Sequence, residues 1–165
     1  MKFFKFYADS FKGLSREMWY LSIIMFINRA GAMVIPFLSL YLTKSEGYSL
    51  PQVGWIMSAF GIGSVIGAWV GGQLTDTIGH YKTMVLSLIL GGLGFIGLQY
   101  LHTFWTLVIG VGVVMIFVDS FRPAAFTAIN AYSKPENKTR SVTLLRLAIN
   151  LGFSMGPALG GLIIT

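Results

Sequence analysis

The sequence predicts an all-α membrane protein with five transmembrane helices and a cytoplasmic N-terminus. Of its 165 residues, 55% are hydrophobic and 11% are charged, and the mean hydropathy is +0.71. A soluble domain carries about 25% charged residues. The apolar residues gather in five long runs separated by short polar turns, and about 20 apolar residues suffice to cross a bilayer as a helix. Composition and pattern therefore agree on a multi-pass integral membrane protein.

Residues 1–18 are predicted to form a cytoplasmic lead-in to the first span. Aromatic and basic residues alternate in it, as in segments that lie on an anionic membrane surface. The apolar run that follows, about residues 19–43, contains Arg29 and has no small-residue cleavage site. It is therefore predicted to be an uncleaved transmembrane helix and not a signal peptide.

The second and third predicted spans cover about residues 51–75 and 83–101. Ser49, followed by Leu50 and Pro51, is a typical helix start for the second span. Glycine recurs in this span at every fourth residue, which predicts a face without side chains on which another helix packs closely. These glycines are Gly63, Gly67 and Gly71.

The fourth and fifth predicted spans cover about residues 104–129 and 141–165. Asp119, Arg122 and Pro123 interrupt the fourth span. The fifth span repeats the four-residue glycine spacing of the second, and we expect both glycine stripes to act as sliding surfaces. The glycines of this second stripe are Gly152, Gly156 and Gly160.

The positions of Lys and Arg predict the orientation of the spans. Eight of these residues lie in the lead-in and in the second and fourth loops, whereas the first and third loops together hold one. Because cytoplasmic loops carry an excess of positive charge, the N-terminus is predicted to lie in the cytoplasm. The net charge of +6 thus follows membrane topology, and no nucleic-acid partner is expected.

The polar turn at residues 72–82 resembles the loop between helices 2 and 3 of the major facilitator superfamily, which is usually Gly-x-Leu-Ala-Asp-Arg-x-Gly-Arg-Lys-Arg. Two of its glycines are expected to let the backbone turn tightly. Its acidic residue is expected to act as a cytoplasmic latch in the conformational cycle. The matching residues are Gly72, Leu74, Asp76, Gly79 and Lys82.

This resemblance implies a chain that holds spans one to five of the N-terminal six-helix half. Members of the superfamily have twelve spans in two related halves, which rock about a central cavity lined in part by spans one and four. The chain stops within an apolar run at Thr165, so we expect the remaining C-terminal half to be absent. The lipid bilayer, the missing half and a small-molecule substrate are the expected partners.

Polar and charged residues inside the predicted spans are the candidates for a substrate and proton pathway. A charge at mid-bilayer costs about 2.5 kcal/mol or more, so it usually faces protein or water. Pairs three or four residues apart share a helix face. The candidates are Asn28, Arg29, Asp119, Arg122, Arg146 and Asn150.

Asp119 is the predicted proton carrier, and Arg29 and Arg122 are predicted to attract the substrate or to tune that carboxyl group. A structural ion pair between Asp119 and Arg122 is the alternative for this pair. An anchoring role near the cytoplasmic surface is the alternative for Arg146.

No arrangement of residues typical of catalysis is present. The histidines, His80 and His102, stand in separate turns, and the chain has no cysteine. No metal-ligand spacing is apparent, and the glycines follow helix-packing stripes instead of a phosphate-binding loop. We therefore predict that the protein is not an enzyme and has no metal or cofactor, with a proton as the coupling ion.

Two transporter families compete for the function. Residues 152–161 are similar to the span-five motif of drug:proton antiporters, Gly-x8-Gly-x3-Gly-Pro-x2-Gly-Gly, although its first glycine is Thr143 here and the usual span-four arginine is not found near Val113. This resemblance implies multidrug efflux by antiport, with a kinked fifth helix that is smooth against the other half. The matching residues are Gly152, Gly156, Pro157, Gly160 and Gly161.

The other resemblance is to the proton-dependent oligopeptide transporters. Residues 25–29 align with their Glu-x-x-Glu-Arg, of which Arg29 matches and both glutamates are missing, and Arg122-Pro123 resembles their lysine-proline pair. This implies proton-coupled symport of a peptide or another small solute. An interaction or assembly role for a truncated half is the alternative of a different class. In each case we expect the bacterial inner membrane or the plasma membrane.

Overall fold

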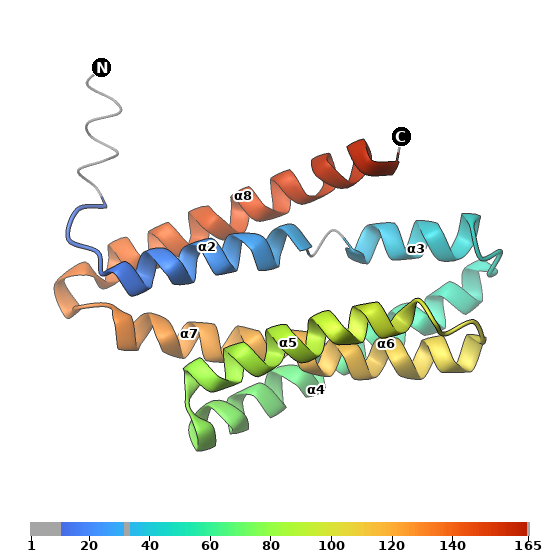
Figure 1. Ribbon diagram of the computed structural model, residues 1–165, viewed down its shortest axis with the longest axis horizontal. Coiled ribbons are helices and arrows are strands. Elements are labelled where there is room, and N and C mark those ends of the chain that lie inside the picture. The colour runs from blue at the N-terminus through green and yellow to red at the C-terminus, as the bar shows by residue number, and fades with distance from the viewer. Residues whose placement is uncertain (1–10, 32–33, 165) are drawn as a thin grey trace. The chain divides into compact units, whose positions relative to one another are not determined.

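The computed structural model describes residues 11–31 and 34–164, and it is built of helices (Figure 1). This described part contains no strand, which confirms the predicted all-α fold. Most of the lead-in, residues 1–10, lies outside the described residues. The elements are α2 (Arg16–Gly31), α3 (Val34–Lys44), α4 (Leu50–Ile78), α5 (His80–Leu98), α6 (Phe104–Asp119), α7 (Phe121–Tyr132), the 3₁₀ turn η1 (Pro135–Asn137) and α8 (Lys138–Ile164).

The chain divides into two compact units. Unit 1 takes Met1–Leu38 and Ile129–Thr165, and unit 2 takes Ser39–Ala128. Within unit 1, α2 packs against α8, and within unit 2, α4, α5 and α6 pack against one another (Figure 1).

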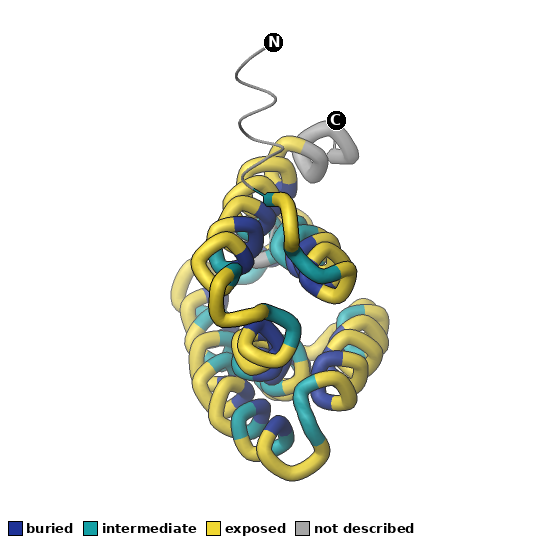
Figure 2. The backbone as a smooth tube through the Cα atoms, turned by 90° about the vertical axis from the view of Figure 1, so that its left-hand side faces the viewer, coloured by how far each residue is buried: buried dark blue, intermediate teal, exposed yellow. Residues whose placement is uncertain are grey.

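Three helical stretches in the described part are long and apolar enough to cross a membrane. They are Leu50–Ile78, His80–Leu98 and Phe104–Tyr132, which correspond to the second, third and fourth predicted spans. Figure 2 shows buried residues as narrow stripes along helices that are otherwise largely exposed. On α4 the exposed residues include Trp55 and Trp69, each about two-thirds exposed. Large apolar side chains on the outer face suit a lipid environment.

The first predicted span is divided between α2 and α3, and residues 32 and 33 between them lie outside the described residues. Helix α2 begins at Arg16, earlier than predicted, because Ser15 caps it: the Met18 N–H donates to the Ser15 hydroxyl over 3.2 Å. The predicted start of the second span is confirmed. There the Ser49 N–H donates to the Gln52 side-chain oxygen over 2.9 Å, and Pro51 stands in the first turn.

The turn between α4 and α5 is far shorter than predicted. Helix α4 continues through Gly72 and Asp76 to Ile78, and α5 begins at His80, so that Gly79 alone joins them. Gly79 has φ +88°, which confirms its predicted role. The prediction that Gly72 also makes the turn is wrong. The helix accommodates the threonines here because their hydroxyls donate to carbonyl groups of the same helix; Thr75, for example, donates to Gly71 O over 2.6 Å.

Replacing Gly79 with alanine should destabilise the full-length protein by about 1–3 kcal/mol, because a side chain strains a backbone held at positive φ. The apparent melting temperature in detergent measures this effect. Gly72→Ala is the matched control, since nothing lies within 4 Å of a Cβ at that helical position. Equal melting temperatures for the two variants would contradict the assignment of the turn to Gly79.

The glycine stripe of α4 packs on the backbone of α6, which confirms the predicted close packing. A Cβ at Gly67 would lie 2.5 Å from Ile116 O. A Cβ at Gly63 or Gly71 would collide in the same way with the backbone of Gly112 or Ser120. The two helix backbones approach so closely that only glycine fits between them.

The fifth-span stripe is used in the same way in unit 1. A Cβ at Gly152 would lie 2.6 Å from Phe26 O, and one at Gly156 would lie 2.5 Å from Ala30 O, both on α2. Helix α8 runs through Pro157 to Ile164 and so includes Gly160 and Gly161, whose surroundings lie outside the described residues. A helix of the same unit covers each stripe at the described glycines. The expectation that the stripes act as sliding surfaces stays a prediction.

Candidate functional site

Asp119 is a carboxylate held inside unit 2. It is the last residue of α6, and only 8% of its surface is exposed. Because it lies within the stretch Phe104–Tyr132, it is a buried acid in a predicted membrane span. Such a group needs partners to offset the loss of its hydration.

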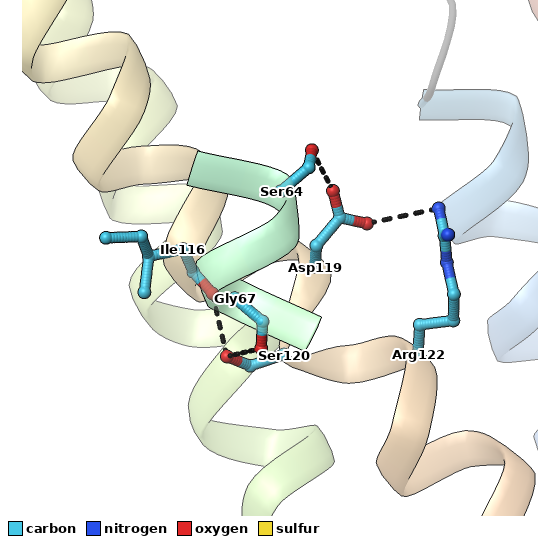
Figure 3. A network of polar contacts seen from close by, with 6 residues as sticks. All are labelled: Ser64, Gly67, Ile116, Asp119, Ser120 and Arg122. Carbon is cyan, nitrogen blue, oxygen red and sulfur yellow. Dashed lines mark hydrogen bonds and ion pairs between the residues drawn. The ribbon is translucent and has the colours of Figure 1, made fainter. Parts of the chain in front are cut away.

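Two side chains donate hydrogen bonds to this carboxylate. The hydroxyl of Ser64 on α4 donates to Oδ2, and Arg122 Nη2 on α7 donates to Oδ1 over 3.3 Å (Figure 3). The predicted contact between Asp119 and Arg122 is thus confirmed. Ser64 joins it from a different helix, and the three side chains form one polar cluster, which we call the Asp119 cluster.

A second polar contact fastens the same region of α4 to α6. The hydroxyl of Ser120 lies 3.0 Å from Gly67 O on α4 and 2.7 Å from Ile116 O on its own helix (Figure 3). Ser120 is buried, and Gly67 is a central member of the glycine stripe. The Asp119 cluster therefore lies directly on the tightest helix contact of unit 2.

The interruption of the fourth span has a local cause. Pro123 has no N–H, so the carbonyl group of Asp119 loses the donor that a continuous helix would supply four residues later. Helix α6 ends at Asp119, and α7 begins at Phe121. Arg122, three residues after Asp119, reaches the carboxylate across the break, and more than half of the arginine side chain, 52%, remains exposed.

The remaining pathway candidates belong to unit 1. Arg29, in the last turn of α2, is half-buried and lies over the ring of Phe153 on α8, with 5.7 Å between its Cζ and the ring centroid. Asn28 beside it is half-buried, whereas Arg146 and Asn150 on α8 are exposed. Arg29 thus has a cation–π contact within its own unit. A site shared by these residues and Asp119 stays a prediction.

The residues of the superfamily loop motif lie at the ends of α4 and α5. Asp76 is exposed in the last turn of α4, and Lys82 is exposed in the first turn of α5. Leu74 is half-buried on α4. An acid near the negative end of a helix dipole is stabilised by a cationic partner. The role of Asp76 as a latch stays a prediction.

Sequence reasoning missed Ser64, Ser120 and Gly112 as parts of this region. A usable signal for Ser64 was its position next to Gly63, as a polar residue beside a glycine stripe in an apolar span. The described residues hold no group of three or more His, Cys, Asp or Glu side chains placed to bind a metal ion. What the Asp119 cluster presents is a buried carboxylate with one hydroxyl donor and one cationic donor.

A multi-pass helical chain with a buried carboxylate between two packed spans is an integral membrane protein with the features of a transporter. Residues 21–165 match the Major Facilitator Superfamily, and the chain belongs to this family of membrane transporters.

Curated relatives come from several bacteria. The chain is 26% identical over 136 residues to the MFS-type transporter YqjV of Bacillus subtilis, covering 82% of this chain and 33% of YqjV. It is 27% identical to the 4-hydroxybenzoate transporter PcaK of Acinetobacter baylyi, covering 87% of this chain and 32% of PcaK. It is 26% identical to the quinolone resistance protein NorA of Staphylococcus aureus, covering 90% of this chain and 38% of NorA. The chain thus spans about a third of the length of these relatives.

Proposed function

We propose that this chain is part of a proton-coupled antiporter that exports small, drug-like solutes by alternating access. The observation that carries the proposal is the Asp119 cluster, a buried acid with one hydroxyl partner and one cationic partner in a membrane span. The similarity to NorA, named for quinolone resistance, supports drugs as the solute class. The bacterial inner membrane is the proposed location, and the rest of the transporter is the partner.

In this mechanism the proton changes the connection between α6 and α7. Charged Asp119 accepts hydrogen bonds from Ser64 and Arg122. A proton on the carboxyl group removes the charge that Arg122 pairs with and converts one carboxylate oxygen into a donor. Arg122 then becomes available for another anion, and its ion pair no longer holds the start of α7 to the end of α6. Proton binding is thereby coupled to the tight contact between α4 and α6.

The runner-up is proton-coupled symport of a small organic anion or a peptide. The exposed part of the Arg122 guanidinium favours it, because arginine binds a carboxylate through paired N–H groups. The similarity to PcaK, named as a 4-hydroxybenzoate transporter, supports an organic acid. In this case Arg122 attracts the substrate, and Asp119 carries the proton that enters with it.

The experiment that tests the proposal follows protons in proteoliposomes that hold the full-length protein and a lumenal pH dye. A lipophilic cation, a dipeptide and 4-hydroxybenzoate are added in turn, with protein-free liposomes as the control. Antiport predicts lumenal alkalinisation as the lipophilic cation enters, because protons leave in exchange.

Acidification with the dipeptide or the organic acid, beyond that of protein-free liposomes, would instead establish symport and move the assignment to the runner-up. A lumenal pH that responds to none of the three solutes would set aside both solute classes.

A further inference from the structure

The segment that precedes α2 is fixed to the connection between α7 and α8 by three hydrogen bonds. Ser15 donates from its hydroxyl to Tyr132 O over 2.8 Å. The Asn137 side-chain amide donates to Gly13 O over 2.9 Å, and Arg140 Nη1 donates to Lys12 O over 3.2 Å. All these residues belong to unit 1. The two segments are more than 110 positions apart in sequence, and these bonds hold them together.

The backbone at Gly13 is adapted to this contact. Gly13 has φ +86°, a conformation that a residue with a side chain rarely adopts. A Cβ at this position would also lie 3.3 Å from the Asn137 side-chain nitrogen. The contact thus requires a particular backbone conformation at Gly13, and Asn137 makes it through an uncharged side-chain amide.

The contact joins two segments that both carry exposed basic residues, and we call the two joined segments the basic lead-in surface. All five of its cationic residues are exposed, and two exposed acids, Glu17 and Glu136, leave it with a positive balance. Trp19, which is 44% exposed, packs edge-on against Phe11 at a centroid distance of 6.3 Å beside it. The cationic residues are Lys12, Arg16, Lys134, Lys138 and Arg140.

We propose that the basic lead-in surface binds the phosphate group of an anionic phospholipid. Arg16 opens α2, and Trp19 follows one turn later. Because tryptophan prefers the membrane–water interface, the proposal places this end of α2 at that interface. Basic residues at this depth attract anionic headgroups. A soluble acidic partner would leave the apolar face of Trp19 unused, whereas a lipid contacts the ring with its chains and the cations with its phosphate.

The test uses the full-length protein in neutral detergent. Phosphatidylglycerol with brominated acyl chains is titrated in, and quenching of tryptophan fluorescence is measured, with brominated phosphatidylcholine as the uncharged probe. Phosphatidylglycerol should quench at lower concentration than phosphatidylcholine. Lys138→Gln should weaken its binding roughly fivefold, the effect of about one cation near a membrane surface.

Two further variants test whether lipid binding depends on the contact between the two segments or only on the total positive charge of the protein. Asn137→Ala leaves the net charge unchanged but removes the hydrogen bond to Gly13, and it should also weaken binding. Lys44→Gln, at the C-terminal end of α3, changes one exposed charge elsewhere and should have no effect. Size-exclusion elution checks that each variant remains folded.

An equal loss in Lys44→Gln, no loss in Asn137→Ala, or equal quenching by both lipids would overturn the proposal. Displacement of the lipid by soluble glycerol phosphate at equal concentration would overturn it as well, because the binding partner would then be a free phosphate. None of these readouts depends on transport, so they are independent of the proposed antiport.

Discussion

Replacing Gly67 with alanine is expected to lower the stability of the full-length protein by about 1–3 kcal/mol, the range for overpacking of a tight core. The new Cβ would lie 2.5 Å from Ile116 O and 2.9 Å from Met115 O, and a backbone carbonyl cannot rotate away as a side chain can. The α4–α6 contact would have to open, which also strains the hydrogen bond between Ser120 and Gly67 O. The melting temperature in detergent measures the loss.

Two alanine substitutions on the same helix serve as controls. Nothing lies within 4 Å of a Cβ at Gly54 or Gly61. Because alanine favours a helix over glycine by up to about 1 kcal/mol, these variants should be neutral or slightly stabilised. Melting temperatures that fall equally in all three variants would mean that helix α4 is sensitive to any side chain, and the close contact with α6 would not explain the effect.

Replacing Asp119 with asparagine is expected to abolish proton coupling in the full-length transporter, with a rate loss of about a hundredfold or more, as for a group that must exchange a proton. Asparagine keeps the shape and can still accept a hydrogen bond from Ser64, but it carries no exchangeable charge for Arg122. Solute-driven pH change in proteoliposomes measures the loss. Solute exchange that needs no net proton movement should persist, because the fold and the binding groups remain.

Ser64→Ala should give a smaller loss, since it removes one of the two donors to the carboxylate and leaves the charge in place. Glu17→Gln neutralises an exposed acid in the first turn of α2 and should leave coupling intact. If Asp119→Asn retained solute-driven proton movement, Asp119 would be only a structural partner of Arg122. The proton carrier would then lie elsewhere in the transporter.

The membrane class and most helix positions could be predicted because they depend on local composition. A run of apolar residues must satisfy its backbone polar groups internally in lipid, so it forms a helix wherever its neighbours lie. The α4–α5 turn was predicted too long because Thr75, Asp76 and Thr77 are polar. Their polarity is typical of the membrane surface, but it does not end the helix, because the threonine hydroxyls can donate to carbonyl groups of the same helix.

The candidate site likewise holds one contact that local spacing predicts and one that depends on how the helices pack. The pair of Asp119 and Arg122 was predictable because residues three apart on a helical stretch meet through local geometry alone. Ser64, 55 positions from Asp119, was not, because nothing in the sequence states which face of α4 meets α6. The same holds for the docking of Asn137 on Gly13.

By itself, the sequence determined that this protein is a helical membrane protein with two glycine stripes and with charges inside its spans. Hydropathy, charge placement and four-residue spacing are properties of one segment at a time, and each can be read without knowing its neighbours. Only the tertiary structure decided which helix fills each stripe and which side chain completes the Asp119 cluster. Those choices depend on the close approach of two backbones, and many pairings of five similar apolar helices satisfy the same sequence pattern.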